Sequence, residues 1–425
     1  MVFHTAAVDY APAGTVNALW LLVAAALVLL MTPGVAFFYG GMVRAKSVIS
    51  MMMMSFGAMA IVAVLWVAYG YGLSFGPALI PHVLGKPDWF LNDLMGKDGM
   101  TGDLGSLAFA GFQATFAIIT VALISGAIAD RAKFGSWMIF AGIWVTVVYF
   151  PVAYWVFNLS DGWIASVLHV NDFAGGTAVH INAGAAGLAL ALVLGKRVGF
   201  QKGMNKPHNV PLTLLGASLL WFGWFGFNAG SEAAVDGVAA LAWINTLAAP
   251  AAATIGWLIV EKIKDGKPTS IGAASGAVTG LVAITPACNI LTPFWGMVLG
   301  LFAGAVCCVA IDLKYRLGFD DSLDVVGVHM IGGIVGTLWI GIFGFTHVDG
   351  DPTKPFSSLL YGGSFAQLGA QAIGAFSVLI YSFVMAFVIG TIIQKTIGFR
   401  IKNEDELAGV DTVVHGEEGY TLETV

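Results

Sequence analysis

Long runs of apolar residues without a formal charge are the feature that most limits what this chain can fold into. Residues 107–129, LAFAGFQATFAIITVALISGAIA, contain no Asp, Glu, Lys or Arg, and comparable runs recur along the chain. A helix needs about 20 apolar residues to cross a bilayer. Backbone groups in lipid must hydrogen-bond one another, so runs of this length predict membrane-spanning helices.

Eleven spans are predicted when the chain is divided at its charged and turn-rich segments. They lie at about residues 17–40, 48–75, 107–129, 134–157, 176–195, 212–230, 237–260, 270–286, 291–311, 325–345 and 366–398. The eighth is short, and 76–106 is predicted to be a polar loop. Only 10% of the 425 residues are charged, against roughly 25% in a soluble protein. The predicted fold is therefore an all-α polytopic membrane protein.

Lysine and arginine lie almost entirely on one side of the predicted membrane. The three basic residues on one side are Lys86, Lys97 and Lys354. The other 16 of the 19 follow odd-numbered spans and lie on the opposite side: Arg44, Lys46, Arg131, Lys133, Lys196, Arg197, Lys202, Lys206, Lys262, Lys264, Lys267, Lys314, Arg316, Lys395, Arg400 and Lys402. Because cytoplasmic loops carry the excess of basic residues, the amino terminus is predicted outside and the carboxyl terminus inside.

Other features exclude several classes of function. The net charge of −6 comes mostly from outer loops and an acidic tail, and no basic patch predicts a nucleic-acid partner. Cys288, Cys307 and Cys308 lie in or beside spans without metal-ligand spacing and are interpreted as small apolar filler. No metal site and no cofactor are predicted. The amino end has no lysine or arginine before Arg44, so it lacks the charged start of a signal peptide.

The fifth and tenth spans share a pattern. Each has an upstream aspartate and a histidine followed by glycines four and seven positions later; these are His180, Gly184, Gly187 and His329, Gly333, Gly336. Each histidine thus lies in the last span of a block of five. Because five is an odd number, the second block enters the membrane from the other side. Such inverted repeats occur in transporters whose pathway lies at the repeat interface. Glycines at this spacing let helices approach closely, which predicts two imidazoles between the halves.

The chemistry of two buried histidines limits the solute. No acidic or basic side chain lies centrally in any predicted span, so a permanent cation would meet an uncompensated desolvation cost there. Burial favours the neutral ring, which offers one N–H donor and one acceptor nitrogen. This suits a small uncharged solute or a transferred proton, whereas zinc needs three or four ligands. The alternative is two unrelated histidines that each hydrogen-bond a neighbouring helix.

The chain resembles the ammonium transporter (Amt/Mep/Rh) family, and its bacterial Amt branch, from about residue 14 to the tail. The similar segments, in order, are PGVAFFYGGMVRAKSV, GFQATFAIITVALISGAIADR, DFAGGTAVHINAGAAGL, KRVGF…KPHNVPLTLLG, WFGWFGFNAGS, TPAC and DVVGVHMIGGIVG. The resemblance implies a homotrimer in the inner membrane with one pore per subunit. It also implies a transmembrane domain over 1–398, with inverted repeats at about 17–195 and 212–345 and an eleventh helix at about 366–398.

The resemblance implies roles for individual residues. The pore histidines look like His180 and His329, and the phenylalanine gate at the pore entrance looks like Phe116 and Phe227. The outer ammonium site would use Phe116, Ser231 and an aromatic residue of PVAYWVFN. Ammonium would be deprotonated there, ammonia would pass the histidines, and its proton would be carried separately along them.

This chain departs from the family at the outer site. The family usually has tryptophan where this chain has Phe157, and Trp155 lies two positions earlier. A shift of two residues turns a helical side chain to another face, so Phe157 is expected in the site and Trp155 elsewhere. Trp224 and Phe112 are further pore candidates.

Two aspartates near the ends of spans are interpreted as structural. Asp172 is expected to cap the helix that carries His180, with direct contact to ammonium as the alternative. The resemblance favours an indirect role for it in shaping the outer vestibule. Asp324 is expected to act in the same way on the inner side.

The tail, residues 399–425, resembles the family's cytoplasmic regulatory tail, which couples to trimeric PII-type signalling proteins; a disordered acidic tail is the alternative. Three function classes remain. The first is facilitated ammonium uptake, and the second is an ammonium sensor that signals through a PII-type partner. The third, a membrane enzyme, lacks a nucleophile, a central carboxylate and a third metal ligand, so no enzyme activity is predicted.

Overall fold

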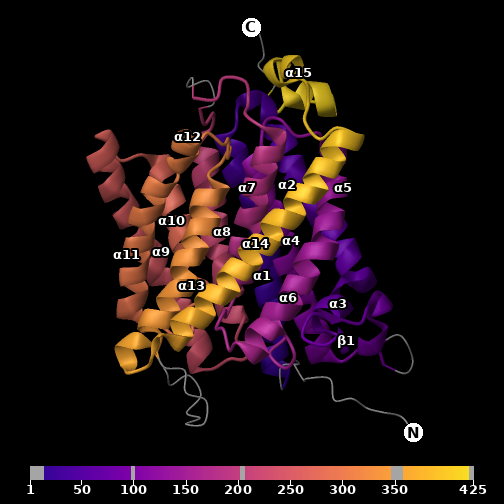
Figure 1. Ribbon diagram of the computed structural model, residues 1–425, viewed down its shortest axis with the longest axis vertical. Helices are drawn as coiled ribbons and strands as arrows, with labels where there is room; N and C mark the ends of the chain where they lie inside the picture. The colour runs from indigo at the N-terminus through magenta and orange to yellow at the C-terminus, as the bar shows by residue number, and fades with distance from the viewer. Residues whose placement is uncertain (1–13, 97–100, 202–205, 346–357, 421–425) are drawn as a thin grey trace.

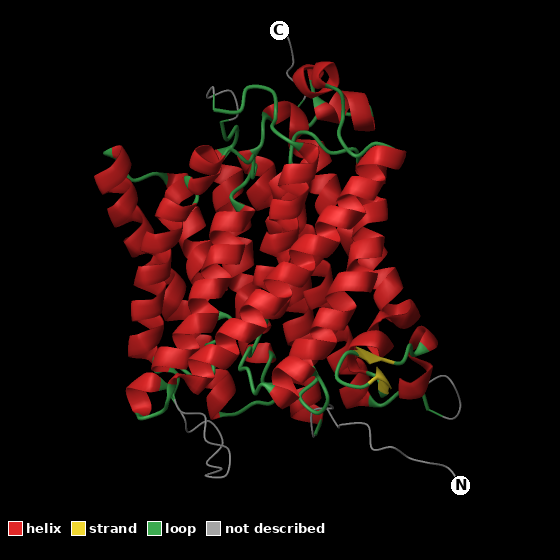
Figure 2. Ribbon diagram, in the orientation of Figure 1, coloured by secondary structure: helices red, strands yellow, loops and turns green. Residues whose placement is uncertain are grey.

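The computed structural model describes residues 14–96, 101–201, 206–345 and 358–420. Most of these residues lie in helices or helical turns, with two short paired strands at one end of the molecule (Figure 2). The long helices run side by side between the two ends, and α14, Phe365–Thr396, crosses them obliquely (Figure 1).

The first part of the chain forms α1 Thr15–Met42, α2 Val48–Leu65, α3 Tyr71–Phe75, α4 Leu104–Ile124, α5 Phe134–Trp144, α6 Phe150–Phe157 and α7 Asn182–Leu194. The second part forms α8 Val210–Gly230, α9 Gly237–Asp265, α10 Ser270–Ile284, α11 Pro293–Ala310, α12 Leu313–Leu317, α13 Gly332–Phe343, α14, and α15 Asn403–Ala408. The strands are β1 Ala78–Ile80 and β2 Leu84–Gly85.

Short π and 3-10 turns extend or join these helices. The π turns are η2 Trp66–Gly70, η5 Val145–Tyr149, η6 Trp163–Val167, η7 Gly176–Ile181, η8 Val326–Ile331 and η10 Asp411–His415. The 3-10 turns are η1 Ala45–Ser47, η3 Trp89–Leu94, η4 Ser125–Ile128 and η9 Leu359–Tyr361. Because η7 leads directly into α7 and η8 into α13, each pair forms one continuous helix.

The helical membrane architecture agrees with the prediction from sequence. In the described part of the chain, ten helical stretches are long and apolar enough to cross a membrane, and their ends lie near the predicted ones. At the predicted short eighth span, α10 is apolar but has only 15 residues, about 22 Å at the rise of an α-helix. The count of eleven therefore stays a prediction. The predicted polar loop at 76–106 contains β1, β2 and η3.

Several helices begin at side chains that replace missing backbone partners. The side-chain oxygens of Asp103, Asn209 and Asp236 accept backbone N–H groups in the first turns of α4, α8 and α9. An N-terminal turn leaves such donors without a carbonyl partner, so these caps stabilise the helix starts by about 1 kcal/mol each. The charged or amide residue between two apolar runs therefore marks where the next helix begins.

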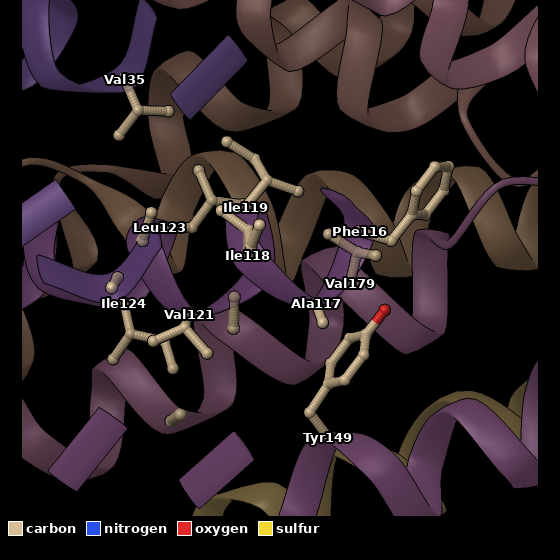
Figure 3. Close-up of a cluster of buried hydrophobic side chains, with 14 of the residues drawn as sticks. Val35, Phe116, Ala117, Ile118, Ile119, Val121, Leu123, Ile124, Tyr149 and Val179 are labelled. Atoms are coloured by element: carbon tan, nitrogen blue, oxygen red, sulfur yellow. The ribbon is translucent and has the colours of Figure 1, made fainter. Parts of the chain in front are cut away.

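The core of the protein surrounds α4. In the most apolar window of α4 and η4, 83% of the residues are buried, against 33% for α14. Figure 3 shows side chains of α4, from Phe116 to Ile124, beside Val35 of α1, Tyr149 and Val179. A helix that is apolar all round belongs inside a bundle, whereas a helix with a half-exposed apolar surface faces lipid.

Small residues bring α1 and α8 together, and these helices come from different halves of the chain. A Cβ on Gly216 of α8 would lie 2.2 Å from the backbone nitrogen of Phe38, and one on Gly34 would lie 3.2 Å from the backbone nitrogen of Leu220. The approach at Gly216 requires glycine, and the one at Gly34 leaves little room for a Cβ. The two halves therefore meet through a close glycine-mediated contact.

Loops from distant parts of the chain meet at the end that carries α15 (Figure 1). Arg44 donates to the Glu406 carbonyl oxygen at 2.8 Å, and Lys46 donates to the carbonyl oxygen of Leu407. The backbone nitrogen of Val198 donates to the Glu406 carboxylate at 2.7 Å. The loops that follow α1 and α7 are therefore joined through α15, as expected if their basic residues share one side.

The tail continues along the same surface beyond α15. The Asp411 carboxylate accepts the backbone N–H groups of Ile49 and Ser50 at 3.0 and 2.7 Å, at the start of α2. Further on, the hydroxyl of Tyr420 lies 2.8 Å from Nε2 of His208. Residues 399–420 are thus docked on the helices, unlike a free acidic tail.

Candidate functional site

Two buried histidines lie in contact near the centre of the protein. His180 is in η7 and His329 is in η8, and their Nδ1 atoms are 3.3 Å apart. The rings are nearly parallel, with centroids 5.4 Å apart and an angle of 19° between their planes. His180 is 1% exposed and His329 is 3% exposed. The structure therefore brings together the two residues that the repeat pattern paired.

The glycines after each histidine explain how the two helices approach. A Cβ on Gly184 would lie 2.6 Å from the backbone nitrogen of Met330, next to His329. A Cβ on Gly333 would lie 2.9 Å from the carbonyl oxygen of Gly176 in η7. Any larger side chain at either position would push η7 and η8 apart, and would separate the imidazoles with them.

The contact between the rings constrains where their protons lie. One N–H hydrogen fits between two Nδ1 atoms, so one neutral ring donates through Nδ1 and the other carries its hydrogen on Nε2. Nε2 of His180 is buried and has no hydrogen-bond partner among the described residues. The two rings therefore form a short hydrogen-bonded chain with one direction from donor to acceptor. This direction reverses when a proton enters at one end and another leaves at the opposite end.

The cavity beside the histidines is narrow and mostly apolar. His180, His329, Tyr39 and Trp224 line it, together with Met31, Val35, Phe38, Ile119, Leu123, Leu220, Phe227 and Val278. The space in which the centre of a water-sized molecule can lie is about 10 Å³. This volume is close to the minimum for a single water. A hydrated ion does not fit, whereas a molecule of the size of water does.

The predicted phenylalanine gate is stacked beside the histidines. The rings of Phe116 in α4 and Phe227 in α8 are 4.1 Å apart at 11°, and the Phe227 centroid is 6.0 Å from that of His180. Both phenylalanines are fully buried. The ring centroid of Phe157 lies 6.1 Å from that of Phe116 in an edge-on contact, and the centroid of Phe112 lies 4.8 Å from that of Phe116. Four predicted aromatic residues therefore form one cluster.

The two tryptophans singled out from the sequence have different surroundings. Trp224 stacks on His180 at 5.3 Å and its Nε1 donates to the hydroxyl of Thr285. Trp155 turns away, since its Nε1 donates to the carbonyl oxygen of Val83 and its ring packs on Tyr381. Phe157 and not Trp155 thus joins the aromatic cluster, as the helical offset of two residues predicts.

Ser231 and Asp172 have polar partners that define what they can bind. The hydroxyl of Ser231, at the end of α8, donates to the carbonyl oxygen of Phe227 at 2.8 Å, so its lone pairs can accept from a donor. Asp172 accepts four backbone N–H groups, from residues 175 to 178, at 2.6–3.1 Å. Burial raises the pKa of Asp172, and these bonds oppose the effect. Asp172 therefore caps η7, as predicted.

The inner counterpart of Asp172 was wrongly predicted. Asp324 has a positive φ of 63°, and its carboxylate is 2.6 Å from Nζ of Lys314 and does not cap a helix. Instead, Asp321 accepts the backbone N–H of Val326 at 2.7 Å. Asp321 precedes His329 by the same eight residues that separate Asp172 from His180, which is the sequence signal that identifies it. Tyr39, which lines the histidine cavity, was also not predicted.

A second, open cleft lies on the side of the docked tail. It has a volume of about 510 Å³ and is lined in part by Arg197, Lys314, Ser322 and Asp324. Arg197 makes two hydrogen bonds of 2.9 Å to the Asp320 carboxylate and one of 3.0 Å to Asp130. Buried charges arranged in this way hold the loops around the cleft in place.

Comparisons with known proteins extend over nearly the whole chain. A model described as the Ammonium Transporter Family matches residues 19–420. The ammonium transporter of Mycobacterium tuberculosis is 51% identical over 426 residues, which cover 94% of this chain and 89% of that protein. The ammonium transporter of Bacillus subtilis is 44% identical over 404 residues, which cover 93% and 96%.

Solved structures give the same result for the fold. A protein named Sensor Amt Protein superimposes with a TM-score of 0.86 at 29% identity, and the match covers 94% of this chain and 98% of that one. Mep2 of Saccharomyces cerevisiae superimposes with a TM-score of 0.83 at 30% identity, covering 96% and 92%. The similarity therefore concerns the complete helical arrangement and is not confined to one motif.

Proposed function

This chain belongs to the ammonium transporter family, and from that premise we propose that it takes ammonium from one side of a membrane and conducts it as ammonia past His180 and His329. The observation that carries this proposal is the contact of two buried imidazoles in a narrow apolar cavity, next to the Phe116–Phe227 stack. Its relatives are named transporters, so the protein is not an enzyme.

At the outer end, we place ammonium on the aromatic faces of Phe116 and Phe157. A cation over such rings gains about 0.5–2 kcal/mol, depending on how far it is desolvated. The hydroxyl of Ser231 accepts one ammonium N–H. Asp172 keeps an indirect role, because four backbone N–H groups already occupy its two carboxylate oxygens.

Selection against metal ions follows from the dry cavity. Potassium cannot lose a proton, and it would enter the cavity without its hydration shell or a compensating carboxylate. Ammonium can leave its proton and continue as a neutral molecule that hydrogen-bonds. Ammonia meets the imidazoles one at a time, and the proton is handed along the same pair.

The proposed topology has eleven helices in two inverted repeats, at about 17–195 and 212–345, with an eleventh helix at about 366–398. The amino terminus is outside and residues 399–425 are cytoplasmic. The convergence of Arg44, Lys46 and Arg400 on α15 supports this orientation. We further propose a homotrimer in the bacterial inner membrane with a pore in each subunit.

We propose that the docked tail couples transport to a PII-type signalling protein on the cytoplasmic face. The tail joins the loops after α1 and α7 and lies on the side of the open cleft, so a partner that binds there would contact both. The second candidate function is a sensor, which the similarity to a protein named Sensor Amt Protein favours. In that case pore occupancy would be reported through the tail.

Reconstitution of the full-length protein in liposomes separates the two functions. An inward ammonium gradient should give an ammonium-dependent electrical current and a change of lumen pH above that of protein-free vesicles. A sodium gradient serves as the control. Absence of both signals from folded wild-type protein would exclude transport and leave the sensor.

A further inference from the structure

Two buried aspartates precede the two histidines by the same number of residues. Asp172 lies eight residues before His180 and Asp321 lies eight residues before His329. Asp172 is 8% exposed and Asp321 is 1% exposed, and each precedes a π turn, η7 or η8. Asp172 lies near the start of α14, through Asn171 and Gln371, whereas Asp321 lies on the side of the docked tail. The two carboxylates thus occupy related places at opposite ends of the passage.

These aspartates differ in how their oxygens are satisfied. Both oxygens of Asp172 accept two backbone N–H groups each. In Asp321, Oδ2 accepts the N–H of Val326 and the N–H of Val325 also stabilises the carboxylate, but Oδ1 is buried and has no hydrogen bond of good geometry from the described part of the chain. A buried anionic oxygen without a donor is costly, and a proton on it removes the charge. Asp321 is therefore suited to bind and release a proton.

The side chains of the neighbouring aspartates are paired with basic side chains, so Asp321 is the carboxylate of this group whose protonation can change. Asp320 is held by Arg197, and Lys314 donates to the Asp324 carboxylate at 2.6 Å and to the backbone carbonyl oxygen of Asp321 at 3.1 Å. Burial raises the pKa of Asp321 to about 6, the charge of Lys314 opposes this, and Asp324 adds to it. A carboxyl with a raised pKa holds a proton more readily than an exposed aspartate does.

Asp321 lies in the chain segment between the open cleft and His329 of the narrow cavity. Tyr39 of α1 and His329 both line the narrow cavity. On the other side, the next residues in the chain, Ser322 to Asp324, line the open cleft of about 510 Å³. Asp321 therefore joins the wall of the open cleft to the helix that carries His329.

We propose that Asp321 is the proton-exchange residue at the inner end of the passage; this rests on the proposed function. The neutral carboxyl gives its proton to ammonia, so its O–H bond breaks, an N–H bond forms, and carboxylate and ammonium result. The carboxylate then takes the proton that left ammonium at the outer end and moved along the histidines. Atoms and charge balance, and one positive charge crosses for each ammonium.

The test uses full-length protein in liposomes with two readouts, the ammonium-evoked current and the pH of the lumen. In Asp321→Asn the current should fall by at least about tenfold, as for loss of a proton-transfer group, while ammonia that crosses without its proton alkalinises the lumen beyond the level of protein-free vesicles. Asp321→Glu should restore part of the current. Asp312→Asn is the matched control, since it removes an acid that pairs with Lys264 at the protein surface, and should behave as wild type.

Each result decides the question. A wild-type current in Asp321→Asn, or the loss of both readouts in a folded variant, overturns the proposal. Wild type that gives neither a current nor a change of lumen pH beyond that of protein-free vesicles refutes the proposed transport itself. Should Asp321→Asn fail to fold, infrared difference spectra of wild type with and without ammonium must contain a protonated-carboxyl band that Asp321→Glu shifts, and its absence overturns the proposal.

Discussion

The Nδ1 atoms of His180 and His329 lie 3.3 Å apart, although 149 residues separate them in the chain. Two neutral rings in this geometry share one hydrogen, so the protonation of either ring depends on the other. Neither ring can be replaced without changing the hydrogen bonding of its partner. This coupling is the basis for the first prediction.

Replacing either histidine by alanine should lower the ammonium-evoked current by about 100-fold, the typical effect of losing a proton-transfer group. The double variant should lose little more than either single variant, because the pair acts as one unit. His169→Asn is the control; His169 is exposed and has a φ of 53°, which asparagine tolerates. Additive losses in the double variant would contradict the coupling.

Substituting Phe157 by tryptophan should increase the apparent affinity for ammonium by about two- to tenfold. Tryptophan binds cations more strongly than phenylalanine does, and Phe157 lies edge-on to Phe116 in the aromatic cluster. The measurement is the half-saturating ammonium concentration of the current, with thermal unfolding as a check on packing. Unchanged affinity and selectivity in a folded variant would remove Phe157 from the outer site.

Gly184→Ala should destabilise the protein by about 1–3 kcal/mol and abolish most transport. The new Cβ would lie 2.6 Å from the backbone nitrogen of Met330, so η7 and η8 must separate. Gly135→Ala in α5 is the matched control, because a Cβ there meets nothing within 4 Å. The readout is the thermal unfolding temperature in detergent. Equal unfolding temperatures for the two variants would show that the close approach is not required.

The docked tail depends on the buried carboxylate of Glu406, which accepts the N–H of Val198 at 2.7 Å and pairs with Arg400 at 2.9 Å. In Glu406→Gln an amide replaces one charged acceptor, and we expect faster hydrogen exchange in residues 399–420 with unchanged exchange in the membrane helices. Glu404→Gln, at an exposed position of α15, should leave exchange as in wild type. Identical exchange in both variants would show that Glu406 does not hold the tail.

The ion pair between Asp320 and Arg197 predicts a pH dependence of stability. Burial alone would raise the pKa of Asp320, but the hydrogen bonds and charge of Arg197 outweigh it and hold the pKa below its ordinary value. A lowered carboxyl pKa adds stability above the unfolded pKa, about 3.9, and this stability is lost as the pH falls through the folded pKa. The unfolding temperature of wild type should therefore exceed that of Asp320→Asn above about pH 5, and the difference should shrink below about pH 4. A difference that stays constant with pH would refute this account.

By itself, the sequence determined the positions of the helices and the pairing of their functional residues. Runs such as 107–129 leave a helix in lipid as the available structure, because backbone groups there have no water to bond. The shared spacing of His180 and His329 with their glycines indicated that the two rings meet. The capping role of Asp172 was likewise predictable, because a carboxylate just ahead of a helix satisfies its free N–H groups.

Only the tertiary structure decided which atoms face one another. The contact through Nδ1 of both rings and the stacking of Phe116 on Phe227 depend on how helices from both halves pack. Side-chain partners that are far apart in the chain are set by the packing of the complete core, which the local pattern of apolar and polar residues does not specify. The same reason explains why the docking of the tail onto the loops after α1 and α7 became visible only in the folded chain.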